Sequence, residues 1–154
     1  MSRGPALMLA AAILASSCQS GPVPPAALDA SAGEACRWCR MAIADIHTTG
    51  QIVAPMEDPL FFDDIGCLRD YLRGPAPSRP GAIAYVADHR TGAWVHAARA
   101  VYTRARTLDT PMGSRLIAHA DPSSRDADPA SAGGDAPTPE ELFGPHGPPD
   151  GDER

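Results

Sequence analysis

The pattern of apolar and polar residues predicts short strands around a single helix. Ile, Val and Ala recur in five short segments with the spacing of strands. A turn and one further short ordered segment are also expected. The strands are predicted at 39–47, 51–54, 82–87, 93–97 and 115–119, the turn at 55–59 and the short piece at 98–106.

Helical spacing is found at 64–73. Ile65 and Leu68 fall on one side of such a helix, and Asp63 or Asp64 can cap its first turn. The order of strands, helix and further strands predicts an α+β fold, built from two small ββα(β)-type units packed together.

The N-terminus has the features of an export signal. Arg3 is followed by ten apolar residues at 6–15, whereas a membrane-spanning helix needs ~20. Small residues then precede Cys18, as in bacterial lipoprotein signals. We therefore expect 1–17 to be a lipoprotein signal peptide and Cys18 to carry the lipid. This places the protein outside the cytoplasm, anchored to the cell membrane or to the periplasmic side of the outer membrane. An ordinary secretory signal with cleavage nearby is the alternative.

Composition separates a folded middle from the two ends of the chain. Residues 18–33 are rich in Pro, Ala and Gly and predict a disordered lipid tether, and 144–154 predict a disordered acidic tail rich in Pro and Gly. The folded domain is expected at 34–120, with an extension to about residue 143 left open. The chain has 154 residues and a formal net charge of −6. These values favour a single domain and argue against a nucleic-acid partner.

Cys36, Cys39 and Met41 belong to the most informative motif, C-R-W-C-R-M. A c-type haem site would need a histidine where Arg40 stands. Zinc and iron–sulfur sites need more ligands than the remaining cysteine of the folded domain, Cys67, supplies. A thioredoxin-like pair would open a helix, whereas a strand is expected here.

A copper(I) site fits the remaining pattern. In an extended chain, Cys39 and Met41 would present a thiolate and a thioether on one face, and these soft ligands select Cu(I). Met112, in the turn at 110–113, is the expected third ligand. The alternatives are a Cys36–Cys39 disulfide and packing of Met41 in the core.

Three further residues are kept as candidate metal ligands: Cys36, Cys67 and His119. Cys67 also fits a buried neutral thiol, and the acid pair Asp63-Asp64 is explained by helix capping. The sequence contains no Ser-His-Asp pattern, phosphate-binding loop or nucleotide fingerprint. We therefore expect no catalytic residues.

Three blocks of the sequence resemble the NosL family, the lipoprotein copper chaperones of nitrous oxide reductase assembly. Residues 36–43 are similar to its C-x-x-C-G-M-x-I motif, 62–68 to its F-D-D-I-G-C segment and 110–114 to its T-P-M-G-S turn. Arg40 replaces the glycine of the first motif, and Arg115 follows the third motif where glycine is common. A glycine-dependent bend can therefore not be assumed at position 40.

The resemblance implies a non-enzymatic carrier of Cu(I) outside the cytoplasm. The Cys-x-Met pair of the family falls on Cys39 and Met41, and the methionine of its turn falls on Met112. Copper would pass to nitrous oxide reductase or to its assembly ABC-transporter complex. The implied fold has two ββαβ units, similar to units in organomercury lyase. Relatives continue with an Ala-rich helix, which Pro122 and Pro129 predict to be short or absent here.

The sequence leaves other functions open. An extracytoplasmic thiol-disulfide protein would use Cys36 and Cys39 and would begin a helix at this pair. A structural lipoprotein would hold the same pair as a disulfide and bind no metal. Organomercurial cleavage by Cys39, Cys67 and an aspartate rests on analogy of fold. A general copper-binding lipoprotein without the nitrous oxide reductase client is a further alternative.

Overall fold

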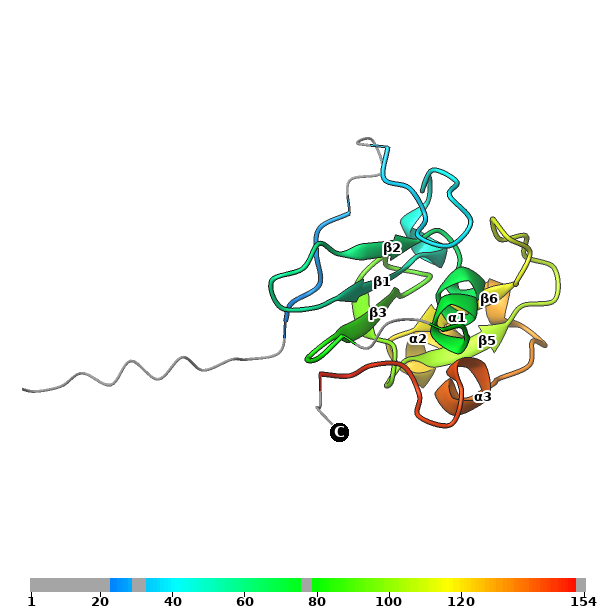
Figure 1. Cartoon of the computed structure of the whole chain (residues 1–154). Coiled ribbons are helices and arrows are strands. Elements are labelled where there is room, and N and C mark those ends of the chain that lie inside the picture. The colour runs from blue at the N-terminus through cyan, green and yellow to red at the C-terminus, as the bar shows by residue number, and fades with distance from the viewer. Residues whose placement is uncertain (1–22, 29–32, 76–78, 152–154) are drawn as a thin grey trace, which may run out of the picture.

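The computed structural model describes residues 23–28, 33–75 and 79–151 (Figure 1). The predicted signal peptide and its lipidated Cys18 lie outside these residues. Within them, no helix is long and apolar enough to cross a membrane.

A four-stranded antiparallel sheet forms the first layer of the fold, in the order β2-β1-β3-β4. Its strands are β1 (Gly50–Val53), β2 (Leu60–Phe62), β3 (Ile83–Ala87) and β4 (Trp94–His96). Every residue of the two central strands is buried, so both faces of the sheet are covered.

A second, two-stranded sheet packs beside the first and completes the core. It pairs β5 (Val101–Arg104) with β6 (Leu116–His119) in antiparallel register. An isolated parallel bridge between Asp88 and Ala118 joins the two sheets. Helix α1 (Ile65–Arg73) contacts β1, β2 and β6, and lies over the junction (Figure 1). The α+β class is therefore confirmed. A run of two strands and a helix occurs twice along the chain, as β1, β2 and α1 and as β5, β6 and the helix at Pro122–Asp126.

Helix α1 forms where the sequence predicts it. Asp64 is its N-cap, and the carboxylate accepts a hydrogen bond from the Gly66 backbone N–H at 2.6 Å. The apolar side, which includes Ile65 and Leu68, is fully buried. Gly50 allows this close packing, because a Cβ at that position would lie 2.9 Å from Leu68 Cδ2.

The predicted strand at 39–47 is wrong. The chain turns at Cys36–Cys39 and then forms a 3-10 helix, η2 (Ile46–Thr48), capped by Asp45. Backbone hydrogen bonds within the turn take the place of the bonds between strands. The spacing of apolar residues does not show where such a turn forms. The structure also adds β2, whose three residues are too few to give a clear alternation.

The C-terminal region is folded well beyond residue 120. Three short helices follow β6, each with a proline in its first turn and a polar N-cap. Proline is favoured at that position because its missing N–H is not needed there. The prolines expected to interrupt a helix therefore begin short ones: α2 (Pro122–Asp126), η3 (Pro129–Ser131) and α3 (Pro139–Phe143).

Both predicted disordered ends include ordered contacts. Leu142 and Phe143 of α3 are buried in the main core. Past α3, the Pro149 carbonyl accepts a hydrogen bond from the Ala84 N–H at 2.8 Å, so the predicted disorder from 144 is absent as far as residue 151. At the other end, Gln51 binds the backbone of Ala26 through both its amide oxygen and its amide nitrogen.

Candidate metal centre

The Cys36–Met41 turn is closed by its own backbone. The Cys36 N–H donates to the Met41 carbonyl at 2.8 Å, and the Arg40 N–H donates to the Cys36 carbonyl at 3.1 Å. The Arg37 N–H also donates to the Phe61 carbonyl at 2.7 Å, which fixes the turn on β2. Arg40 adopts a left-handed conformation with φ of 69°. The backbone conformation that a glycine would favour is therefore adopted by an arginine at position 40.

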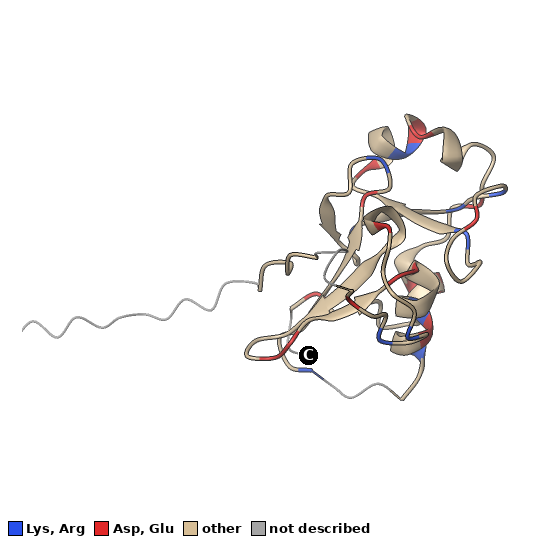
Figure 2. Cartoon of the chain, turned by 90° about the horizontal axis from the view of Figure 1, so that it is seen from above, with Lys and Arg blue, Asp and Glu red and all other residues tan. Residues whose placement is uncertain are grey.

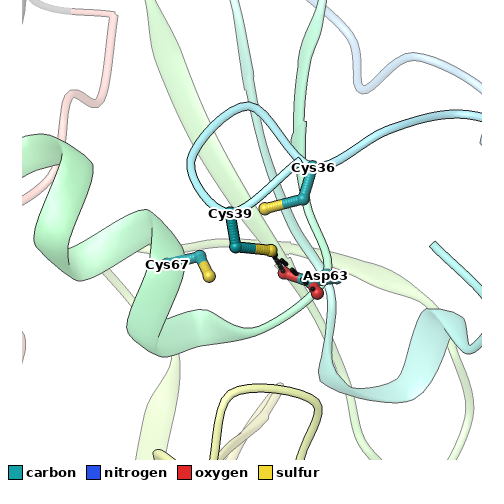
Figure 3. Close-up of side chains that lie close together, drawn as sticks. All are labelled: Cys36, Cys39, Asp63 and Cys67. Atoms are coloured by element: carbon teal, nitrogen blue, oxygen red, sulfur yellow. Dashed lines mark hydrogen bonds between the residues drawn. The ribbon is translucent and has the colours of Figure 1, made fainter. Parts of the chain in front are cut away.

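Three cysteines and one aspartate meet beneath this turn (Figure 3). Cys36 and Cys39 come from the turn, Asp63 follows β2, and Cys67 lies in the first turn of α1. Their three sulfur atoms and a carboxylate oxygen all lie within 4.8 Å of one another. Four donor atoms from three separate segments therefore surround one point.

The burial of the cluster is uneven. Cys36 and Cys67 are almost completely buried, and Asp63 is only 2% exposed. Cys39 is half-buried, and its thiol donates to both carboxylate oxygens of Asp63, at 3.3 and 3.2 Å. Cys39 is thus the member of the cluster closest to solvent. All three of these cysteines are free thiols, so the Cys36–Cys39 disulfide considered above is not formed.

The thiols differ strongly in acidity. A hydrogen bond from Cys67 lowers the pKa of Cys36 to about 6, although burial opposes this shift. The same hydrogen bond, together with burial, raises the pKa of Cys67. Burial also raises the pKa of Cys39, to about 11. Cys36 is therefore the thiol of the cluster that ionises first, and Cys39 and Cys67 hold their protons more strongly.

Asp64 connects α1 to the turn that carries Met112. One of its carboxylate oxygens accepts from the Thr110 hydroxyl at 2.6 Å and from the Met112 N–H at 2.9 Å. The other accepts from the Ser114 hydroxyl and from the helix N–H at Gly66. The F-D-D-I-G-C and T-P-M-G-S blocks are therefore held together by one buried side chain.

Met112 faces the same pocket as Cys67. The pocket has a volume of about 310 Å³. Its lining includes the side chains or backbone of Trp38, Gly66, Cys67, Arg69, Met112 and Ser114. Met112 is 50% exposed, as expected for a large apolar residue that is not part of the core. It therefore lies on the exposed side of the pocket that Cys67 also lines.

The structure brings together some of the predicted ligands and separates others. Cys36, Cys39 and Cys67 form one cluster. Met41 is 43% exposed at the end of the turn, and the argument that it shares a strand face with Cys39 is wrong because no strand forms there. His119 belongs to a different cluster, in which its ring is bonded to Asp128.

Asp63 was missed as a possible ligand. The sequence shows a pair of aspartates before the helix, and capping accounts for only one of them. The structure assigns the cap to Asp64 and turns Asp63 toward the thiols. One aspartate is enough to cap the helix. The second aspartate of the pair was therefore the signal in the sequence that pointed to another role for Asp63.

The donor set is suited to a thiophilic metal ion. Thiolates are soft ligands that favour Cu(I) and also bind Zn(II), and one carboxylate oxygen is acceptable to the latter. Metal binding would require deprotonation of the remaining thiols, and the preformed Cys36 thiolate supplies an initial ligand.

The fold and this cluster define an α+β protein with a thiol-rich site that could hold a metal ion. The family model described as NosL matches residues 26–142. The chain therefore belongs to the NosL family, whose members are copper-binding accessory proteins outside the cytoplasm. No curated protein and no solved structure matches the chain.

Proposed function

We propose that this protein is an extracytoplasmic lipoprotein that carries Cu(I) and supplies it for assembly of the nitrous oxide reductase catalytic centre. The observation that carries the copper proposal is the convergence of Cys36, Cys39 and Cys67 beside Asp63. The family supports the client and the lipid anchor, which would be attached at Cys18.

Copper binds first at Cys36, whose thiol is the most acidic of the three. Cys36 is fully buried, yet the hydrogen bond from Cys67 favours its ionised form. A monovalent cation that binds there neutralises a buried negative charge, which stabilises the complex. Cys39 and Cys67 can each replace a proton by the metal, so copper binding releases protons and strengthens as the pH rises.

Release uses the exposed side of the site. Cys39 is half-buried, Met41 is exposed two residues further along the chain, and Met112 is exposed in the pocket that Cys67 lines. Thioethers are neutral, soft ligands that can bind Cu(I) without a proton leaving. Exchange of a buried thiolate for an exposed thioether would bring the ion to the surface, where an acceptor protein offers its own ligands.

The expected acceptor is nitrous oxide reductase or its assembly ABC-transporter complex, and the membrane is a partner only through the lipid. Nucleic acid is not expected, since the net charge is −6 and Figure 2 shows acidic and basic residues interspersed in this view. No enzymatic step is required of the protein.

Organomercurial cleavage is a second candidate because of the contact between Cys39 and Asp63. Two thiolates could bind the mercury of an R–Hg⁺ species, and Asp63 could relay a thiol proton to the carbon. The products would be R–H and mercury held by two sulfur atoms. Incubation with a phenylmercury salt distinguishes this candidate, which predicts release of benzene, whereas a copper carrier releases none.

An anaerobic Cu(I) titration against a chromophoric chelator tests the carrier. We expect the reduced Cys18→Ala protein to remove one equivalent of Cu(I) from the chelator. Cys36→Ser and Cys39→Ser should each weaken binding at least about tenfold, since each removes a soft ligand. Equal retention of copper by the chelator with all of these proteins would overturn the proposal.

The methionines have a matched control in Met56, which is fully exposed in a turn outside the site. Met112→Leu and Met41→Leu should weaken Cu(I) binding or slow its transfer to an acceptor, and Met56→Leu should do neither. The client is tested in cells by deletion of the gene. Nitrous oxide reductase should then accumulate without its catalytic copper centre, and normal enzyme would reject this client while leaving copper binding intact.

A further inference from the structure

A second cluster of metal-binding side chains lies apart from the thiols. It consists of His89 in the loop after β3, His119 at the end of β6, and Asp128, the N-cap of η3. One ligand atom from each of these residues lies within 4.8 Å of the others. His89 lies 39 residues before Asp128, so the fold brings it to the pair formed by His119 and Asp128.

A single carboxylate oxygen is shared by the two imidazoles. Asp128 Oδ2 lies 2.6 Å from His89 Nδ1 and 2.9 Å from His119 Nε2. The two rings are nearly perpendicular, with an interplanar angle of 73° and centroids 6.3 Å apart. Both rings therefore direct a nitrogen at the same carboxylate oxygen from different sides, which places three potential donor atoms next to one another.

The site is buried on one side and accessible on the other. His119 is completely buried, and the side chain of Asp128 is only 6% exposed. The side chain of His89 is 18% exposed. Asp128 also lines a pocket of about 480 Å³ along α2 and η3. An ion can therefore enter past His89 or through this pocket.

A neighbouring carboxylate holds the three segments in place. Asp88 accepts hydrogen bonds from the Ala120 N–H at 2.8 Å and from the Ser124 hydroxyl at 2.7 Å. Asp88 precedes His89, Ala120 follows His119, and Ser124 lies in α2. These hydrogen bonds therefore join the segments that carry the cluster. The second oxygen of Asp128 accepts from the Ala130 N–H at 2.9 Å, which fixes its orientation. Supporting contacts of this kind preorganise metal sites.

The donor set differs in chemistry from the thiol cluster. Two imidazoles and a carboxylate favour borderline divalent cations such as Zn²⁺ and Cu²⁺, and such sites leave further positions for water. Metal–ligand distances of about 2.0–2.1 Å in a tetrahedral site place the ligand atoms roughly 3.3 Å apart. The observed separations of 2.6 and 2.9 Å would need to widen by well under 1 Å.

The hydrogen-bonding of His119 is compatible with the exchange of a proton for a metal ion. Its buried Nδ1 has no hydrogen-bond partner, so Asp128 alone orients the ring among the described residues. When an ion binds Nε2, the proton can move to Nδ1 without breaking another contact. The same tautomeric shift allows His89 to bind through Nδ1.

We propose that His89, His119 and Asp128 form a second metal site, which binds a borderline divalent cation. This site is independent of the copper carrier proposed above, because it shares no residue with the thiol cluster. The protein would then hold two metals of different chemistry, a soft monovalent ion at the thiols and a divalent ion at the histidines.

Zinc titration with nitrogen-resolved NMR of the histidine side chains tests the site. Zn²⁺ is added to the reduced protein, and its affinity is measured by competition with a chelator. We expect the resonances of His89 Nδ1 and His119 Nε2 to move on binding, with His146 unchanged. The resonances report on the ligands directly, so zinc that binds at the cysteines does not confuse the result.

Variants make the test decisive. His89→Asn and Asp128→Asn should weaken binding of this zinc ion at least about tenfold, since each removes a ligand. His146→Asn is the matched control, because His146 is an exposed histidine outside the cluster. Circular dichroism checks that the variants are folded. The proposal is overturned if the two histidine resonances stay fixed when zinc is in excess, or if the His119 resonance of His89→Asn moves at the same zinc concentration as in the parent protein.

Discussion

Asp64 accepts a hydrogen bond from the backbone N–H of Met112 at 2.9 Å while it caps helix α1. The helix carries Cys67, so one carboxylate sets the position of a buried thiol and of an exposed thioether. Movement of the Met112 turn is thereby linked to the helix that supports the thiol cluster. This contact joins the two blocks at 62–68 and 110–114, which resemble NosL motifs and lie far apart in the chain.

Asp64→Ala should destabilise the fold strongly. The substitution removes the helix cap and leaves the buried hydroxyl of Thr110 without its acceptor. Loss of a cap costs about 1 kcal/mol and each unsatisfied buried group about 1–3 kcal/mol. We expect the free energy of unfolding in urea to fall by roughly 2–4 kcal/mol. Asp70→Ala on the exposed side of α1 is the control and should change it by less than about 0.5 kcal/mol. Equal effects of the two would refute the proposed role.

Gly66→Ala should disturb the same junction by crowding. A Cβ on Gly66 would lie 2.5 Å from the Cβ of Ser114. Overpacking of this kind costs about 1–3 kcal/mol. Urea unfolding should show this loss, and the double variant with Ser114→Gly should recover part of it. The absence of any recovery would indicate that the two residues are not in conflict.

The sequence was sufficient for the parts of the fold that depend on periodicity. Helix α1 and the strands near β3, β4 and β6 follow from apolar spacing and a cap, which are local signals. The Cys36–Cys39 turn was missed because its local backbone hydrogen bonds leave no mark in the apolar spacing, and β2 was missed because it is short and depends on pairing with β1. The short C-terminal helices were underestimated because proline was weighed as a helix breaker and not as a first-turn residue.

The site was predictable in its sulfur chemistry and less so in its geometry. The cysteines and their soft-metal preference could be identified from residue types alone. The pairing of Cys39 with Met41 depended on a strand that does not form. The approach of Cys67 and Asp63 depends on how α1 packs under the turn, and spacing along the chain carries no information about this.

Arg40→Gly should stabilise the protein. Arg40 has φ of 69° and Arg115 has φ of 59°, both in the left-handed region where a side chain is disfavoured by about 1–2 kcal/mol. Glycine removes this strain but increases the entropy of the unfolded chain, which costs about 0.4–1 kcal/mol. The net gain in unfolding free energy should be about 0.5–1 kcal/mol at each position. Arg40→Ala is the control for loss of the charged side chain and should give no gain. A decrease for both glycine variants would mean that the arginine side chains contribute contacts that outweigh the strain.

The stability of the reduced protein should depend on pH through the thiol cluster. The pKa of Cys36 is lowered by Cys67 from 9.0 to about 6, so its contribution is complete above the unfolded value and is lost as the pH falls through 6. The pKa of Cys39 is raised by burial from 9.0 to about 11, so its contribution is complete below 9.0 and is lost as the pH rises through 11. The unfolding free energy should therefore rise between about pH 6 and 9 and fall above that range.

Anaerobic urea unfolding at a series of pH values measures this profile, and ultraviolet absorbance of the thiolate locates the lower titration. Cys36→Ser should abolish both the rise and the thiolate step, and Cys67→Ala should shift that step upward because the hydrogen bond from Cys67 is lost. A thiolate step that persists in Cys36→Ser would assign the acidic thiol to another cysteine.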